Sequence, residues 1–170
     1  VSLEIWKIYF DPEATFPNDQ NGSYDLLSKD KRLQFKTARR TNRNGLTLDL
    51  RRAAGKKAGK QTYQPYSSGS FDEVVVMFLD WKLNKVHIWK IPEDILIQKN
   101  LLITENCKGQ QGFDVYIPTE KHALRLRKSG EYFADTWTHD YYTGTEDIPT
   151  YFGIEAETVA KRFFDECRNK

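Results

Sequence analysis

The sequence predicts an α/β fold: a mixed central sheet with helices at its edges and a C-terminal extension. Short apolar segments of strand length recur between residues 24 and 117, and turn signals join several of them into hairpins. Two further segments, beginning at Pro92 and at Glu155, have the apolar spacing of amphipathic helices. A chain of 170 residues is expected to form one domain, or one core with an appended arm.

The first strands are expected before residue 51. Residues 3–10 (LEIWKIYF) fit neither the helical nor the strand period, so both structures remain open there. Residues 24–27 (YDLL) predict a short strand, and residues 32–40 (RLQFKTARR) alternate as a strand does. Asn44-Gly45 lies between this segment and an alternating run at residues 46–50, which predicts a hairpin turn.

A second hairpin and two contrasting segments follow. Residues 51–69 are poor in large apolar side chains and are expected to form a long cationic loop. The apolar run at residues 74–79 predicts a strand buried on both faces, and residues 85–91 alternate as its hairpin partner. Residues 113–117 predict a further strand. The aromatic stretch at residues 132–152 is expected to be a subunit interface rather than a base-stacking surface.

Charge is distributed very unevenly along the chain. Residues 29–60 contain twelve Lys or Arg and two acids, a net charge of +10, whereas the other residues carry −8. Such a field is costly in self-repulsion unless a polyanion lies against it, so nucleic acid is the expected partner. A solvated basic loop without a partner is the plainer alternative. Cys107 and Cys167 lie far apart and are expected to be reduced thiols, too few for a structural zinc site.

Three polar side chains are expected to meet on the predicted sheet. A short connection makes the first two strands antiparallel neighbours, so that Asp25 can converge with Gln34 and Lys36, which share one face of the second strand. A carboxylate and an amide oxygen can hold Mg²⁺, and a lysine can orient or deprotonate a water that attacks a phosphodiester. An Asp–Lys pair beside an exposed Gln is the alternative that the spacing leaves open.

With these residues in place, the stretch 24–51 resembles the hallmark region of the PD-(D/E)XK nuclease superfamily, which includes restriction endonucleases, Holliday-junction resolvases and some homing endonucleases. The similarity rests on Asp25 and on Gln34-Phe35-Lys36-Thr37, and it covers roughly residues 1–97. Tyr24 stands where the family often has proline. Gln34 replaces the usual acid, which removes one negative charge from the metal site.

This resemblance implies a restriction-endonuclease-like fold, with residues 1–97 as the nuclease core. Residues 98–170 would be a C-terminal extension used for dimerisation or DNA contact, unless the two parts form one continuous domain. Asp25 and Gln34 would hold Mg²⁺, and Lys36 would act on the attacking water. An acid on the first helix would assist the metal; Glu4 is the first candidate and Glu13 the second.

DNA contacts are expected from two groups of residues. Arginines after the catalytic strand would flank the scissile phosphate, and lysines of the cationic tract would neutralise the DNA backbone: Arg39, Arg40, Arg43, Lys56, Lys57 and Lys60. Amide and phenol groups of the same tract would read base edges: Gln61, Tyr63 and Gln64. Tyr63 and Tyr66 would equally well pack onto the sheet.

The expected function is Mg²⁺-dependent, site-specific cleavage of double-stranded DNA by a homodimer, as in a restriction endonuclease. A homing or junction-resolving enzyme of the same fold is the alternative within the class. Gln34 in place of an acid keeps open a catalytically silent DNA-binding module, and an RNA-binding or RNA-cutting domain is a third interpretation. No stretch has the roughly 20 apolar residues of a membrane span, and no leader is visible, so a soluble protein of the cytoplasm, associated with the nucleoid, is expected.

Overall fold

The computed structural model describes residues 1–18, 23–41, 45–121, 125–126, 129–130, 132–133 and 136–150. Two of the predictions above, the DNA contact of Arg43 and the helix at residues 155–169, lie outside these residues. Within the described part of the chain, no helix has the length and apolar character needed to span a membrane.

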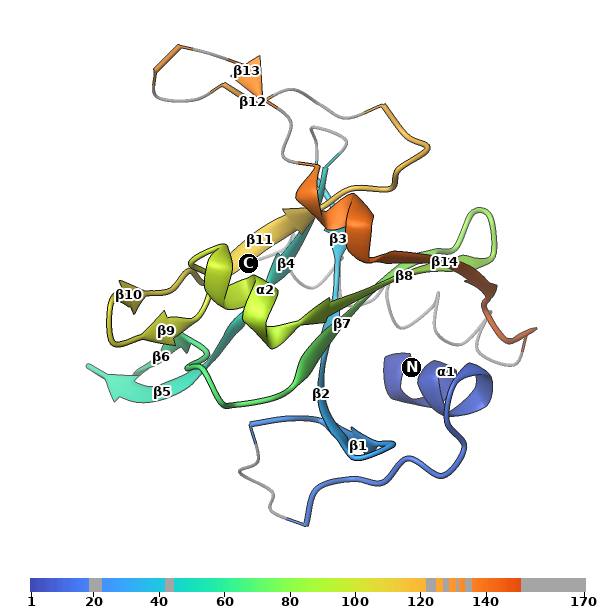
Figure 1. The fold of residues 1–170 in the computed structure, drawn as a ribbon, viewed down its shortest axis with the longest axis horizontal. Coiled ribbons are helices and arrows are strands. Elements are labelled where there is room, and N and C mark those ends of the chain that lie inside the picture. The colour runs from blue at the N-terminus through green and yellow to red at the C-terminus, as the bar shows by residue number, and fades with distance from the viewer. Residues whose placement is uncertain are drawn as a thin grey trace.

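A five-stranded mixed sheet forms the centre of the molecule, with the order β1-β2-β7-β8-β14 (Figure 1). Its strands are β1 (Leu26–Ser28), β2 (Lys31–Thr37), β7 (Glu73–Asp80), β8 (Lys85–Pro92) and β14 (Tyr142–Asp147). β1 and β2 are antiparallel, β2 and β7 are parallel, and β7, β8 and β14 are antiparallel neighbours. The expected pairing of the first two strands and the hairpin at residues 74–91 are confirmed.

The two faces of this sheet bury different side chains. On one face Leu33 and Phe35 of β2 pack with Ile5 and Trp6 of helix α1 (Ser2–Tyr9), which settles the open segment at residues 3–10 as a helix. The opposite face packs against helix α2 (Glu93–Gln98) and a second sheet. Because side chains alternate along a strand, Gln34 and Lys36 lie on this second face, away from α1.

The second sheet has three strands in the order β11-β4-β3: β11 (Gly112–Val115), β4 (Leu46–Asp49) and β3 (Arg39–Arg40). Arg40 pairs with Leu46 in an antiparallel register, so the predicted hairpin around residue 44 is confirmed by its strands. Gly112 permits the close approach of β11 to β4, since a Cβ at this position would lie 2.3 Å from the Leu48 carbonyl oxygen.

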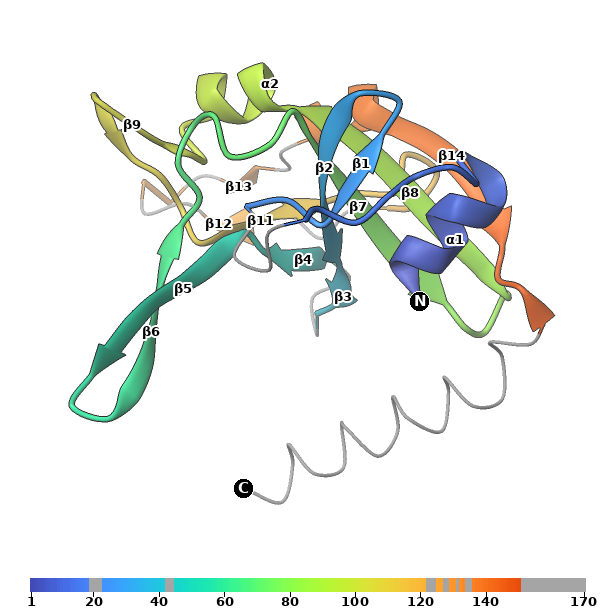
Figure 2. The same cartoon turned by 90° about the horizontal axis from the view of Figure 1, so that it is seen from below.

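The segment at residues 51–69 differs from its prediction. Instead of a loop, it begins with a two-stranded antiparallel ribbon of β5 (Arg51–Lys57) and β6 (Lys60–Pro65), which projects from the body of the molecule (Figure 2). Ala58 and Gly59 close the ribbon, both with positive φ (50° and 78°), as a type I′ turn requires. The ribbon carries no core side chains. Its residues therefore lack the alternating hydrophobic pattern by which a strand is recognised in a sequence.

Short elements complete the chain. They are β9 (Ile103–Thr104), β10 (Cys107–Lys108), β12 (Arg125–Leu126), β13 (Tyr132–Phe133) and a 3-10 helix (Trp137–Tyr141). The expected mixed sheet is present, but helices flank it less than predicted, because the described residues form two α-helices and mostly strands. Both β11 and β14 come from residues beyond 97 and pair with strands that precede it. The boundary proposed there stays a prediction.

Candidate active site

Strand β1 is too short to cover the whole edge of β2, and the Asp25 side chain occupies the position where the strand would continue. The backbone N–H of Asp25 donates to the Leu33 carbonyl (2.8 Å). Beyond this point the Asp25 carboxylate acts as the hydrogen-bond acceptor in place of a backbone carbonyl, because its Oδ2 accepts a hydrogen bond from the Phe35 backbone N–H (2.8 Å). Asp25 therefore supports a strand edge that has no backbone partner at this point within the described part of the chain.

Gln34 lies against this carboxylate, as the sequence predicts. Its side-chain Nε2 donates to Asp25 Oδ2 at 2.6 Å and lies 3.4 Å from the Phe35 carbonyl oxygen. That carbonyl points to the same open edge as the Phe35 N–H, since both groups of a strand residue face one side. One amide nitrogen thus lies between two oxygen acceptors. Gln34 is 4 % exposed, so its amide is almost fully removed from water, whereas Asp25 is half-buried.

Lys36 lies next on the same face of β2 and extends toward Tyr66. Its ammonium is 3.3 Å from the Tyr66 hydroxyl and 5.0 Å from the centre of the phenol ring. Tyr66 follows the ribbon directly and is 7 % exposed, packed edge-on against Phe71. Of the two uses that the sequence left open for Tyr66, packing is therefore the one observed. Its contact with Lys36 could not be expected from spacing, because the two residues are thirty positions apart.

Burial shifts the pKa values of the three ionisable groups at this site. Desolvation raises the pKa of Asp25, although the hydrogen bond from Phe35 and the charge of Lys36 oppose the shift. Desolvation also lowers the pKa of Lys36, against the attraction of Asp25 and Asp49. The pKa of the Tyr66 hydroxyl is raised, mainly by burial and then by the charge of Asp25. Each group is thus held closer to its neutral form than it would be in water.

Further charges border Lys36 from the base of the ribbon. Asp49, at the end of β4, attracts the ammonium, while Arg51 repels it. Arg51 is itself paired with Asp49 at 3.4 Å. Asp49 and the Phe35 carbonyl were not singled out from the sequence. A backbone oxygen carries no sequence signal, and Asp49 reaches the site only through the pairing of β4 in the second sheet.

Glu4 does not join this group. It lies on α1, whose buried side packs against the opposite face of the sheet, and its side chain is 61 % exposed and ion-paired with the N-terminal amine at 2.7 Å. Glu13 is also exposed, in the loop after α1. Assistance from either acid stays a prediction. Among the described residues, no three His, Cys, Asp or Glu side chains gather as a metal cluster.

The expected DNA-binding residues are distributed around the site. Arg39 is exposed on β3, whereas Arg40 is held by Glu120 through two hydrogen bonds of 3.0 Å and lies over the Phe78 ring. Exposed lysines lie toward the end of the ribbon: Lys56, Lys57 and Lys60.

The residues expected to read bases all lie on β6. Gln61 donates to the Gly55 carbonyl at 2.7 Å, so its amide nitrogen ties the ribbon together. Tyr63 lies beneath the Arg51 guanidinium, and Gln64 faces Arg52 across the ribbon.

Known proteins resemble this chain in structure but not in sequence. No protein-family model matches the sequence, and no curated protein matches it significantly. Solved structures similar to it include MepB, with a TM-score of 0.58 and 19 % identity over 84 % of this chain and 95 % of MepB. The bacterial homing endonuclease I-Ssp6803I is similar with a TM-score of 0.50 and 15 % identity, over 76 % of this chain and 73 % of that enzyme. This chain therefore has a fold like that of these two structures. At these identities the likeness extends to the fold alone.

Proposed function

We propose that this protein is a metal-dependent endonuclease that hydrolyses phosphodiester bonds of DNA at the open edge of β2. One observation supports this most strongly: Asp25, Gln34 and the Phe35 carbonyl meet at a strand edge that has no backbone partner among the described residues, beside a half-buried Lys36. Burying such groups is costly unless they are paired or serve a ligand. The likeness to a homing endonuclease supports the same reaction class.

The donor set fits Mg²⁺. Rotation of the Gln34 amide about its last side-chain bond exchanges its nitrogen for its oxygen, and three oxygens then belong to this edge: those of Asp25, Gln34 and the Phe35 carbonyl. Mg²⁺ is usually bound through one or two carboxylates, with water and substrate phosphate oxygens completing its shell. When bound, the ion would supply a water of lowered pKa and neutralise charge that grows on the phosphate.

Lys36 would act on the water or on the phosphate. A lysine whose pKa is lowered by burial gives up its proton more readily, and it can then orient or deprotonate an attacking water. In its charged form the same side chain would offset the charge of the transition state. Tyr66 would position the ammonium through its hydroxyl and ring.

The ribbon would hold the DNA next to this site. A two-stranded β-ribbon is one of the shapes that the major groove admits. Basic side chains on its strands would contact the backbone, and Gln64 would read bases. A single site cuts one strand, so cleavage of a duplex would need a homodimer or two binding events.

A catalytically silent DNA-binding protein is the second candidate, and the hydrogen bonds of Asp25 favour it. Its carboxylate supports the β2 edge by accepting two hydrogen bonds, a role that needs no metal.

Cleavage of supercoiled plasmid in Mg²⁺ and in EDTA separates the two candidates. We expect cleavage in Mg²⁺ only, and we expect Lys36→Met to slow it roughly a hundredfold or more. Lys99→Met is the matched control, because Lys99 also lies over an aromatic ring but outside the site. Binding without cleavage by the wild-type protein would instead establish the silent module.

A further inference from the structure

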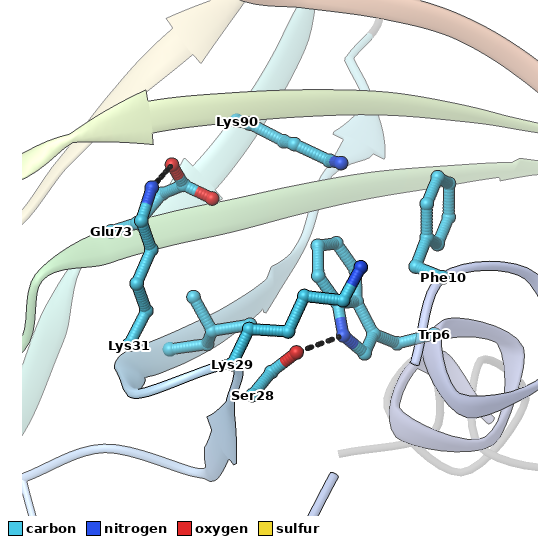
Figure 3. Close-up of a pocket in the computed structure, with 8 residues that line it drawn as sticks. Trp6, Phe10, Ser28, Lys29, Lys31, Glu73 and Lys90 are labelled. Atoms are coloured by element: carbon cyan, nitrogen blue, oxygen red, sulfur yellow. Dashed lines mark hydrogen bonds and ion pairs between the residues drawn. The ribbon is translucent and has the colours of Figure 1, made fainter. Parts of the chain in front are cut away.

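A pocket of about 230 Å³ lies on the other side of the sheet, between α1 and the turn that joins β1 to β2 (Figure 3). Its walls include Trp6 and Phe10 from the first helix and its end, and Leu33 from β2. Leu33 points away from the face that carries Gln34 and Lys36, so this pocket is separate from the candidate active site.

Lys90 has an unusual position in this pocket. It follows Val86 and Ile88 on the core-facing side of the central strand β8, where an apolar residue is the ordinary choice. Its ammonium lies 4.7 Å from the centre of the Trp6 ring and 4.4 Å from that of Phe10. In the described part of the chain it has no ion-pair partner, and burial lowers its pKa.

Lys29 and Lys31 bring two more ammonium groups to the same pocket. Lys29 and Asp30 form the β1–β2 turn with φ of 48° and 65°, a conformation that Asn-Gly would adopt with less strain. Backbone strain of this kind concentrates where a side chain serves a ligand. Figure 3 shows the Lys29 and Lys90 side chains both reaching toward the aromatic wall.

Among the described residues, a single acid lines the pocket. Glu73 is 3.7 Å from the Lys31 ammonium, and its side chain is 12 % exposed. Three lysines therefore face one carboxylate, and the repulsion among the lysines contributes to the lowered pKa of Lys90. An excess of positive charge beside apolar walls is suited to a compact anion.

We propose that this pocket binds a phosphate group, with Lys29 and Lys90 as its principal ligands and Lys31 as the third. Ammonium groups are point-charge donors suited to phosphate oxygens, and the apolar wall leaves room for the group that the phosphate esterifies. The phosphate comes either from a small phosphorylated molecule or from the end of a nucleic-acid strand. The site is independent of the proposed hydrolysis and stands if that function fails.

Calorimetric titration of the full chain with inorganic phosphate, at constant ionic strength, tests the proposal. We expect Lys90→Met and Lys29→Asn to weaken binding at least tenfold. Asn suits the turn at position 29, so that variant should fold at least as well as the wild type. Lys99→Met again serves as the control. Glu73→Gln removes the acid and should tighten binding severalfold, a gain that misfolding cannot produce.

A second titration identifies the source of the phosphate. Short single strands with and without a 5′-phosphate are compared with inorganic phosphate and a 5′-mononucleotide. A preference for the phosphorylated strand that disappears in Lys90→Met indicates a nucleic-acid end, whereas tighter binding of the mononucleotide indicates a small molecule. The proposal is overturned if the wild type binds none of these probes through the phosphate, or if Lys90→Met and Glu73→Gln bind inorganic phosphate as the wild type does.

Discussion

Asp25 combines two roles that are usually separate. Its carboxylate replaces the missing strand partner of Phe35, and in the proposed function it is also the anionic metal ligand at the β2 edge. A substitution by Ala would remove both roles, so a loss of activity could not be assigned to either. Asn keeps an oxygen that accepts the Phe35 hydrogen bond and removes only the charge.

At the residue scale, Gln34→Glu separates metal binding from strand support. The new carboxylate would lie against Asp25, and two like charges at hydrogen-bond distance repel each other. We expect the variant to be less stable than the wild type in EDTA, to recover in Mg²⁺, and to cleave DNA at lower Mg²⁺ concentration. Thermal unfolding and cleavage across a Mg²⁺ series check this. A folded but inactive variant at every Mg²⁺ concentration would mean that Gln34 does not bind metal.

At the scale of elements, the ribbon is where prediction from sequence failed and the central strands are where it succeeded. The run at residues 74–79 predicts β7 because its side chains enter the cores on both faces. Residues of the ribbon are mostly exposed, and cross-strand backbone hydrogen bonds hold it, so composition alone resembled a loop. The Asn-Gly signal was readable, whereas Ala58-Gly59 is a weaker signal for the same turn type.

The ribbon gives a prediction of its own. If its three terminal lysines contact phosphates, replacing Lys56, Lys57 and Lys60 with Ala should weaken binding to every DNA sequence about equally. The slope of log K against log salt should become shallower by about 0.9 for each phosphate that a lysine no longer neutralises. Fluorescence anisotropy of a labelled duplex across a salt series measures both.

The matched control for the ribbon replaces three exposed lysines elsewhere: Lys82, Lys99 and Lys121. Its slope should stay near that of the wild type. Equal slopes for the two triple variants would show that the ribbon does not face the duplex.

At the scale of the whole molecule, the +10 segment does not form a single patch. Lys29 and Lys31 line the pocket on the α1 side, and Lys36 lies in the candidate site on the other face. Arg32 of β2 pairs with Asp72, and the other described lysines and arginines of the segment lie on β3 and the ribbon. The sequence therefore predicted the excess charge correctly but not its division between two faces. That division depends on the alternation of side chains along β2 and on the turn at Lys29, which a count of charges does not include.

Ionisation of Asp25 and ionisation of Asp72 should have opposite effects on the stability of the folded state. Burial raises the folded pKa of Asp25, so its charge costs stability above that pKa and costs nothing once it is protonated at low pH. The Arg32 pair lowers the folded pKa of Asp72, so Asp72 stabilises above the unfolded pKa and loses this contribution as pH falls. Asp25→Asn should therefore raise the midpoint of thermal unfolding at pH 7, and Asp72→Asn should lower it. The difference in unfolding midpoint between each variant and the wild type should shrink toward pH 3. If both variants shift the midpoint in the same direction at pH 7, the opposite roles given to the two aspartates are wrong.

Some residues of the candidate site could be predicted from the sequence, and others could not. Asp25, Gln34 and Lys36 were identifiable because three polar residues interrupt core-forming segments at a spacing that one hairpin brings together. Tyr66, Asp49 and the Phe35 carbonyl were not, because they arrive through long-range pairing or belong to the backbone. Glu4 illustrates the converse, since the sequence left helix and strand both open at residues 3–10 and did not indicate which sheet face this segment covers.

The most direct test of the central claim is the rate of plasmid cleavage by Asp25→Asn in Mg²⁺, measured with its DNA affinity on the same preparation. A metal-binding carboxylate predicts a rate roughly a hundredfold or more below that of the wild type, with affinity unchanged and with stability at pH 7 equal or higher. A rate within a few-fold of the wild type, in a folded variant, would contradict the account, because Asp25 would then support the strand and do no chemistry.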